Sequence, residues 1–364
     1  MWVGVFPELY EVGGIQQVSR HVGAVLVKHA LKRNLRCQLL GLNDVCGRGS
    51  FKVGTDEYGY TGFGRNKMAL ISSLFQLMPR IETLYLGHVN LAPLALLLRV
   101  VRPRIRYCVV THGVEVWEPL PTFRRLGLQH AQRVMAVSAY TAREMVKAQK
   151  LNPQKVFVLS PSLDPSFAQG PCAGASLPLP PCGRMLLTVA RLISSEPGKG
   201  VDSVIKVLPK VMKIVPDVFY VIVGGGDLQP RLEEMARESS VRDRVFFIGK
   251  LQLEQLKMCY SRTDVFVMPS QQEGFGIVFL EAMAYGKPVI AGDHGGAPEI
   301  VQDGVTGFSV NPDDLEALTD RLIQLLQDKA LCTRMGDAGR QRVEEDFTFM
   351  RFEKKLVRIL DTPS

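Results

Sequence analysis

The sequence predicts an α/β protein with two domains that face a cleft, and three observations lead to this fold class. The chain has 364 residues, which is roughly the length of two domains. Short apolar runs alternate along it with segments of helical period, as in a mostly parallel sheet covered by helices. A stretch rich in Pro and Gly, residues 168–183, interrupts this alternation and is interpreted as an interdomain linker.

The first half of the chain contains runs that are typical of buried strands. These runs are Trp2–Phe6, Cys37–Leu42, Thr83–Leu86, Tyr107–Val110, Arg133–Val137 and Val156–Leu159. Helical period is found between them at Gln16–Arg33, Met68–Pro79 and Thr141–Lys150. Because strands and helices alternate, we expect a mostly parallel sheet with helices on both faces.

The same alternation restarts after the linker. The predicted strands are Met185–Val189, Phe219–Val223, Val245–Ile248, Val265–Met268 and Pro288–Ala291. The predicted helices are Val201–Val215, Gln229–Ser239, Leu253–Ser261, Phe279–Tyr285, Leu315–Lys329 and Phe347–Leu360. The cleft between the two halves is the expected binding site.

Composition excludes several classes of protein. With 46% hydrophobic and 22% charged residues, the chain is neither disordered nor a disulfide scaffold. Every apolar run is well short of the ~18–20 residues that span a membrane, and the amino terminus lacks the basic start of a secretory signal. The seven cysteines include no C-x-x-C pair and the histidines no H-E-x-x-H, so we expect reduced thiols in a cytoplasmic protein without a metal site.

Positive charge is concentrated in the first half of the chain. The net charge is +8, which divides into +11 for residues 1–170 and −3 for the remainder. Such an excess indicates an anionic partner, either nucleic acid, a phospholipid surface or a phosphorylated substrate, or simply solvated helix faces. In Gly64–Pro79 and Leu91–Arg106 cations lie beside apolar residues without interleaved aromatics. This pattern disfavours nucleic acid and leaves two interpretations open: peripheral contact with an anionic membrane, or a core-facing leucine stripe with solvated arginines.

The most informative segment is Pro269–Gly286, where a strand, a glycine-containing turn and a helix follow one another. Its glycines let the backbone approach a ligand, and the free N–H groups at the helix start would point at an anion. The residues concerned are Glu273, Gly274, Phe275, Gly276, Ile277 and Val278. The alternative is a tight turn without a ligand.

Two carboxylates, Glu273 and Glu281, flank this anion site. A sugar nucleotide needs such an arrangement: one carboxylate for sugar hydroxyls, amides for the diphosphate and a second carboxylate for ribose hydroxyls. The spacing alone has little specificity, and the intervening G-F-G and the strand–turn–helix context supply the rest.

At these residues the sequence resembles retaining glycosyltransferases of the GT-B fold, in particular glycosyltransferase family 4 (glycosyl transferases group 1). The family signature E-x(7)-E reads E-GFGIVFL-E here, followed by AMAYGKPVIA and GGAPEIVQDGVTGF. The resemblance implies two Rossmann-like domains facing a cleft. Residues 1–167, joined by a C-terminal helix at 346–364, would bind the acceptor, and residues 184–345 would bind the nucleotide-sugar donor.

The resemblance also implies roles for residues outside the signature. Arg191 and Lys199, in VARLISSEPGKG, would hold the diphosphate and stabilise the leaving group. The amides of Gly13 and Gly14 would close on the same diphosphate, and the backbone at Leu251 would contact the nucleobase. The alternatives are two exposed loop cations for the first pair and a plain helix-start turn for the second.

Thr111-His112-Gly113 ends a predicted strand, at the edge where α/β sheets bind ligands. A lone histidine is more often a packing residue, but the resemblance implies that His112 touches the donor sugar. Glu115 would face the acceptor or form a surface salt bridge.

The sequence therefore predicts a retaining hexosyltransferase with His112, Glu273, Arg191 and Lys199 as catalytic residues. The expected donor is UDP-glucose or another UDP-hexose, with GDP-mannose as the alternative, and the acceptor is a glycan, a lipid-linked sugar or a small molecule. No metal or other cofactor is expected, because cations and helix N-termini would stabilise the leaving diphosphate. We expect a cytoplasmic protein with peripheral contact at the inner face of the membrane and no nucleic-acid partner. A nucleotide-sugar 2-epimerase, an α-glucan phosphorylase and a non-enzymatic nucleotide-sugar sensor are the other candidates.

Overall fold

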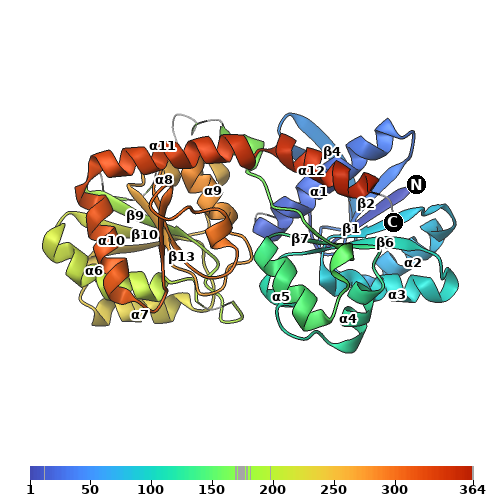
Figure 1. Cartoon of the computed structure of the whole chain (residues 1–364), viewed down its shortest axis with the longest axis horizontal. Coiled ribbons are helices and arrows are strands. Elements are labelled where there is room, and N and C mark those ends of the chain that lie inside the picture. The colour runs from blue at the N-terminus through green and yellow to red at the C-terminus, as the bar shows by residue number, and fades with distance from the viewer. Residues whose placement is uncertain are drawn as a thin grey trace. The chain divides into compact units, whose positions relative to one another are not determined.

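The computed structural model describes residues 1–362 except 12, 169, 171–176, 178, 181 and 197 (Figure 1). The chain divides into two compact units, Met1–Ser166 with Thr348–Ser364 and Phe167–Phe347. Each unit contains its own sheet, covered by helices on both faces (Figure 1). The predicted linker at 168–183 lies largely outside the described residues.

The first unit is built on an eight-stranded sheet with the order β3-β4-β2-β1-β5-β6-β7-β8. Its strands are β1 (Trp2–Phe6), β2 (Cys37–Gly41), β3 (Gly47–Val53), β4 (Asp56–Gly62), β5 (Thr83–Leu86), β6 (Arg106–Thr111), β7 (Arg133–Ala136) and β8 (Val156–Val158). Its helices are α1 (Gly14–Lys32), α2 (Lys67–Leu77), α3 (Ala92–Val101), α4 (Thr122–Gln129), α5 (Ala139–Gln149) and α12 (Phe349–Asp361). All six strands predicted in this half are confirmed, and they pair in parallel.

The hairpin of β3 and β4, the antiparallel pair of this sheet, was not predicted from the sequence. The hairpin contributes alternate side chains to the core: Phe51, Val53, Tyr58 and Tyr60 are all buried. Gly54 lies in the turn with φ +62°. This period-2 pattern around a glycine turn is a hairpin signal, but the polar residues between the aromatic ones masked it.

Helices cover both faces of the first sheet, with α1 and α12 together on one face (Figure 1). The other face packs on α2, α3, α4 and α5 through one continuous apolar core. At the end of α12, the Asp361 carboxylate pairs with His29 of α1 and with Arg33, which follows α1 directly, each at 2.9 Å. The last helix of the chain is therefore an integral part of the first unit.

The second unit is built on a six-stranded, wholly parallel sheet with the order β11-β10-β9-β12-β13-β14. Its strands are β9 (Arg184–Val189), β10 (Val218–Val223), β11 (Val245–Gly249), β12 (Val265–Met268), β13 (Val289–Gly292) and β14 (Gly307–Val310). Its helices are α6 (Val201–Ile214), α7 (Gln229–Glu238), α8 (Leu253–Arg262), α9 (Ile277–Ala284), α10 (Leu315–Gln327) and α11 (Lys329–Asp346). The five predicted strands are confirmed, while β14 and α11 were missed.

Chain order reverses in the second sheet between β9 and its neighbour β12. In parallel α/β sheets the loops after two such strands diverge and leave a crevice at the carboxyl edge, where ligands bind. Every strand residue of β10 and β12 is buried, as expected for strands covered on both faces. The buried sheet is a rigid support for the loops at this edge.

Candidate active site

The turn between β12 and α9 has the geometry of an anion site. Gly276 is the N-cap of α9 with φ +101°, and a Cβ there would lie 2.3 Å from the ring of Phe279. No side chain caps this helix. Ile277 and Val278 are the first helical residues, so their N–H groups have no acceptor within the helix. The turn therefore requires glycine and presents free backbone donors at the positive end of a helix dipole.

Lys199 and Glu273 are in direct contact at this edge. The Nζ atom of Lys199 donates to Oε2 of Glu273 at 3.0 Å, and the two side chains are only 18% and 15% exposed. Glycines on both sides of Lys199 allow the contact: Gly198 has φ +78° and Gly200 has φ +76°. A Cβ at Gly200 would lie 2.5 Å from the Pro269 carbonyl oxygen. The loop after β9 is thereby packed against the loop after β12.

Arg191, the other predicted diphosphate ligand, follows β9 and has a different partner. Its guanidinium donates to both carboxylate oxygens of Glu196, at 2.8 and 2.7 Å. The arginine side chain is 58% exposed, so this pair is weak and easily exchanged for another anion. Glu196 was not predicted as a site residue. Only its position, five residues after Arg191, could have indicated this pairing.

Glu281 lies inside α9, one turn beyond the signature glycines, and its side chain is buried. Its Oε2 accepts a hydrogen bond of 2.6 Å from the hydroxyl of Tyr260 in α8. Burial raises the pKa of Tyr260 well above its usual value, and the neighbouring Glu281 carboxylate adds to this effect. Tyr260 therefore remains a neutral donor that fixes the orientation of the carboxylate.

Several other loops of the second unit reach the same edge. Leu251 is half-buried just after β11, next to Gly249 with φ +68°. Gly224, after β10, has φ +116° and would place a Cβ 1.9 Å from the Ala190 carbonyl oxygen. The three-glycine segment that begins there thus packs directly on the chain after β9. Gly295 packs in the same way on the backbone of Glu273: a Cβ there would lie 2.4 Å from the Glu273 carbonyl oxygen.

In the first unit, three neighbouring strands β1, β5 and β6 end at one edge of the sheet. His112 follows β6, and its Nε2 donates to the Gly87 carbonyl after β5 at 2.8 Å. Nδ1 of a neutral His112 is then left as an acceptor. Glu115 accepts a hydrogen bond from the backbone N–H of His112, so its carboxylate stabilises the turn that holds the imidazole.

His88 is a candidate site residue that sequence analysis missed. Its ring stacks on that of His112 with centroids 5.4 Å apart and 24° between the planes. Burial lowers the pKa of His88 to about 3, with His112 and Arg124 contributing. Its Nδ1 accepts from the N–H of Asn90 at 3.0 Å, so Nε2 carries the proton. Its position in the sequence could have indicated it: His88 comes two residues after the predicted strand Thr83–Leu86, just as His112 comes two residues after the predicted strand Tyr107–Val110.

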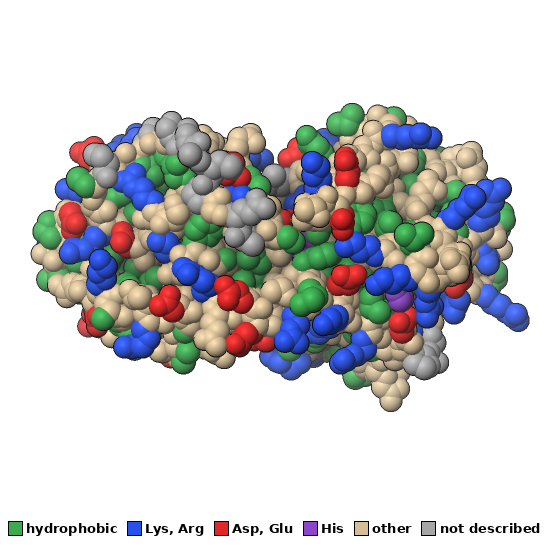
Figure 2. Space-filling model, turned by 90° about the horizontal axis from the view of Figure 1, so that it is seen from above, with side chains coloured by type: hydrophobic (Ala, Val, Ile, Leu, Met, Phe, Trp, Pro, Cys, Tyr) green, Lys and Arg blue, Asp and Glu red, His purple; other side chains and the backbone are tan. Residues whose placement is uncertain are grey.

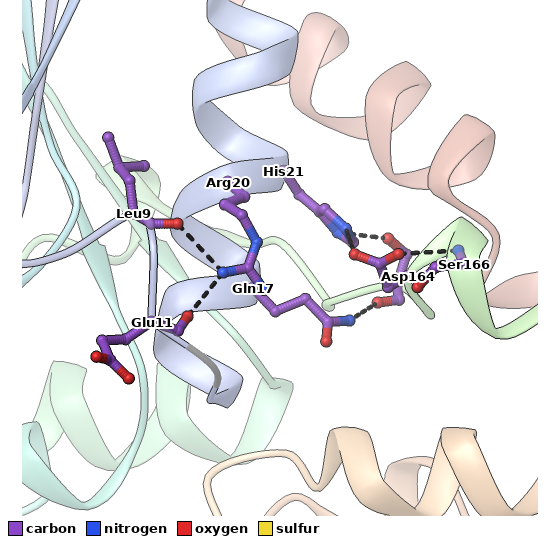
Figure 3. A network of polar contacts seen from close by, with 8 residues as sticks. Leu9, Glu11, Gln17, Arg20, His21, Asp164 and Ser166 are labelled. Carbon is purple, nitrogen blue, oxygen red and sulfur yellow. Dashed lines mark hydrogen bonds and ion pairs between the residues drawn. The ribbon is translucent and has the colours of Figure 1, made fainter. Parts of the chain in front are cut away.

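Residues 9–11, in the loop after β1, are held by Arg20, whose contacts Figure 3 shows, and by Asp44. Arg20 of α1 donates to the carbonyls of Leu9 and Glu11 at 3.2 and 2.8 Å. The Asp44 carboxylate accepts from the N–H of Leu9 at 2.9 Å and of Tyr10 at 2.9 Å. Gly13 precedes α1 as its N-cap, again without a side-chain cap. The described residues 9–11, which come shortly before the uncapped start of α1, are therefore already positioned.

One turn further along α1, His21 and Gln17 contact the segment after β8 (Figure 3). Gln17 donates to the Ser162 carbonyl at 2.9 Å, and His21 Nε2 lies 3.6 Å from the Asp164 carboxylate. Burial lowers the pKa of His21, while Asp164 acts against this. These contacts position α1 behind the Gly13-Gly14 loop.

In the described part of the chain, no three His, Cys, Asp or Glu side chains form a group that could hold a metal ion.

Comparison with known proteins places the sequence in a family. A family model described as glycosyl transferases group 1 matches residues 175–342. A GDP-mannose-dependent alpha-(1-6)-phosphatidylinositol monomannoside mannosyltransferase from Mycolicibacterium smegmatis is 36% identical over 305 residues, covering 77% of this chain and 76% of the relative. The chain belongs to the glycosyl transferases group 1. This glycosyltransferase is also 36% identical over 300 residues to the enzyme of that name from Mycobacterium tuberculosis, with 77% and 76% of the two chains covered.

Solved structures show the same architecture. Sucrose-phosphate synthase from Thermosynechococcus elongatus matches the glycosyltransferase with a TM-score of 0.78 at 20% identity, over 99% of this chain and 98% of the other. HepE from Anabaena in complex with UDP-glucose matches with a TM-score of 0.75 at 16% identity, over 99% of each chain. The predicted GT-B fold, with two α/β units, is confirmed.

Proposed function

We propose that this glycosyltransferase transfers a hexose from a nucleotide sugar to an acceptor with retention of anomeric configuration. The observation that carries the proposal is the contact of Lys199 with Glu273 where the chain order of the second sheet reverses, beside the uncapped start of α9. Retention is supported by the E-x(7)-E signature, which resembles that of retaining enzymes.

The donor diphosphate would displace the Lys199–Glu273 contact. Its oxygens would accept from Lys199 and from the N–H groups of Ile277 and Val278, which lack intrahelical partners. Glu273 would then be free to accept hydrogen bonds from hydroxyls of the sugar. Glu281, oriented by Tyr260, would accept from the ribose hydroxyls. One edge thus offers a separate partner to each part of a sugar nucleotide.

Negative charge develops on the leaving diphosphate as the donor's bond between the anomeric carbon of the sugar and a diphosphate oxygen breaks. Lys199 and the α9 dipole supply fixed positive charge at that point, which is the usual source of transition-state stabilisation. Arg191 would join them by exchanging Glu196 for phosphate. Because these groups are sufficient to balance a diphosphate, we propose catalysis without a metal, so a chelator should leave the rate unchanged.

For the donor we favour GDP-mannose, since four mannosyltransferases whose names specify it are 34–36% identical to this chain. The UDP-hexose expected from the sequence is the competing donor. The names of the same relatives support a lipid-linked, phosphate-containing sugar as the acceptor, which would bring the enzyme to the cytoplasmic face of a membrane. His112 and Glu115, on the first unit, would serve the sugar and acceptor side.

Thermal-shift measurements with GDP-mannose, UDP-glucose and ADP-glucose test the donor assignment, because stabilisation follows affinity. GDP-mannose should give the largest rise in Tm. A larger rise with UDP-glucose would overturn the assignment of GDP-mannose but not the proposed transfer from a nucleotide sugar. No rise with any of the three donors would overturn that proposed transfer. Incubation with donor alone separates a transferase from a 2-epimerase, since only the epimerase would isomerise the sugar nucleotide without an acceptor.

A further inference from the structure

The loops that lead into β6, β7 and β8 form a cavity at the amino edge of the first sheet. These three strands are neighbours and pair in parallel, so the loops before them lie side by side. The cavity has a volume of about 600 Å³, and residues from all three loops line it. Pockets for small molecules measure roughly 300–1,000 Å³, so this cavity has the size of a metabolite site.

Positive charge is concentrated in the wall of this cavity. Five lining residues are Arg or Lys and none is Asp or Glu: Arg99, Arg104, Arg106, Arg133 and Lys155. By contrast, acidic side chains lie among the basic ones on the face of the molecule in Figure 2. The cavity is therefore a local concentration of the positive charge that the first half of the chain carries.

Two of these cations have a structural role at the end of α4. Arg99 donates to the carbonyl of His130 and Lys155 to the carbonyl of Gln129, each at 3.3 Å. A helix C-terminus carries roughly −0.5 charge, which nearby cations stabilise. Packing of the fold therefore explains Arg99 and Lys155 without a ligand.

Arg104 and Arg106 have no comparable role. Arg106 lies 3.5 Å from the Glu82 carboxylate, but the two side chains are 54% and 41% exposed, so this ion pair is weak. The side chain of Arg104 is exposed and forms no hydrogen bond or ion pair with any residue that the structure describes. Both guanidinium groups are therefore available to an anion.

Arg133 is a buried cation in the same wall. It is 8% exposed, and no described Asp or Glu side chain forms an ion pair with it. Its guanidinium donates to the carbonyl of Thr362. The neighbouring Cys108 is a neutral thiol, because burial raises its pKa to about 11, with Arg133 acting against this. Since a buried charge without a counter-ion is costly, a bound anion would stabilise Arg133.

The cavity is separate from the candidate active site. Arg106 and Arg133 are the first residues of β6 and β7, so they mark the amino edge of the first sheet. His88 and His112 follow the carboxyl ends of β5 and β6, at the opposite edge. A ligand in the cavity would therefore not occupy the position of the donor or the acceptor.

We propose that this cavity binds a soluble small molecule that carries at least two phosphate groups. Phosphate suits these side chains because one guanidinium can donate two parallel hydrogen bonds to it. One phosphate group carries only about −1.5 to −2 charge at pH 7, which the three cations Arg104, Arg106 and Arg133 exceed. A soluble molecule fits better than the surface of a bilayer, because a flat surface does not reach the buried Arg133.

Titration calorimetry of the full chain with inorganic tripolyphosphate tests this proposal. We expect saturable binding by the parent protein that weakens as salt is raised, because salt screens the charges. Arg104→Gln with Arg106→Gln should weaken this binding at least about tenfold, since charge-assisted hydrogen bonds are lost. Absence of binding by the parent, or equal binding by this arginine variant, would overturn the proposal.

The matched control is Lys210→Gln with Lys213→Gln, which removes the same charge from exposed positions of α6 in the second unit. This control should bind tripolyphosphate as the parent does, and losses equal to those of the arginine variant would refute the proposal, because binding would then follow overall charge. Urea unfolding should give the arginine variant the stability of the parent, since both side chains are exposed.

Lys199→Ala locates the bound probe in one of the two units. Lys199 belongs to the second unit, so this variant should keep the binding at the cavity. If Lys199→Ala loses tripolyphosphate and the arginine variant retains it, the probe binds at the candidate active site and the cavity proposal fails. The result does not depend on the identity of the sugar donor.

Phospholipid headgroups have the same phosphate chemistry and are the competing source of the ligand. No helix in the described part of the chain is long and apolar enough to cross a membrane. The titration is repeated with vesicles of phosphatidylcholine alone and of a two-to-one mixture of phosphatidylcholine and phosphatidylglycerol. Both should leave the affinity for tripolyphosphate unchanged. Loss of affinity with the mixed vesicles alone would place a headgroup in the cavity and overturn the proposal of a soluble ligand.

Discussion

The Nζ atom of Lys199 lies 3.0 Å from Oε2 of Glu273, and this contact joins the loops after β9 and β12. These neighbouring strands are the point where chain order reverses in the second sheet. The two charges are more than four-fifths buried, so their pairing prepares the site before a ligand arrives. A diphosphate would replace the carboxylate as the partner of the lysine.

Lys199→Ala should lower kcat by about a hundredfold or more, because a cation aimed at the leaving group is lost. Lys206→Ala is the matched control, since Lys206 forms a 3.0 Å pair with Asp202 on the exposed side of α6. Steady-state kinetics of both variants with saturating donor make the comparison. A Lys199 variant that keeps most of kcat would refute the leaving-group role.

Gly276→Ala should destabilise the fold by about 2–4 kcal/mol, through backbone strain and overlap with the Phe279 ring. Gly304→Ala provides the control, because Gly304 also has positive φ, +73°, but no atom lies within 4 Å of its added Cβ. Gly304→Ala should lower the free energy of unfolding by only about 1 kcal/mol. Urea unfolding measures both, and equal losses would show that the Phe279 contact is not the reason for glycine.

Glu281→Gln should weaken nucleotide binding, since an amide is a poorer acceptor for ribose hydroxyls than a carboxylate. Tyr260→Phe should instead lower stability by about 1–3 kcal/mol, because the buried Glu281 carboxylate loses the hydrogen bond from the Tyr260 hydroxyl. Titration calorimetry with GDP and urea unfolding distinguish the two effects. Unchanged affinity in the Glu281 variant would remove the ribose assignment.

Acid should destabilise the protein in part through His88. Its pKa is lowered to about 3 in the fold, against 6.5 when unfolded, so the unfolded chain binds the extra proton between these values. The contribution of His88 to the free energy of unfolding is fully present above pH 6.5 and is lost as the pH falls towards 3. In His88→Asn the loss between pH 7 and pH 4 should be smaller by on the order of 2–3 kcal/mol.

The control for this experiment is the parent protein, whose unfolding free energy is measured at the same pH values. If His88→Asn also follows the parent curve, His88 is not held neutral by burial, and its stack with His112 would need another explanation.

The sequence predicted those parts of the fold whose pattern is local. β10 and β12 are unbroken apolar runs because both of their faces are buried, and they were recognised directly. The β3–β4 hairpin, in contrast, has one polar face, and the polar residues between its aromatic ones masked the local pattern. β14 is only four residues long, and its assignment depends on pairing with β13, which no local pattern contains.

Residue types at the site were predicted more completely than their partners. The glycines around Glu273 and the cations after β9 were visible as motifs. The pairing of Arg191 with Glu196, the bond from Tyr260 to Glu281 and the stacking of His88 on His112 join side chains through geometry that spacing does not encode. The apolar sequence of α3 was visible as a leucine-rich run, but the exposure of Leu97, Val100 and Val101 became apparent only in the folded chain.

The most direct test of the proposed site is titration calorimetry of GDP against the parent protein, Lys199→Ala and Lys206→Ala. We expect the parent and Lys206→Ala to bind GDP equally and Lys199→Ala to bind it at least about tenfold more weakly, because a charge-assisted hydrogen bond is lost. Equal affinity of all three proteins for GDP, or no binding by any of them, would contradict this expectation.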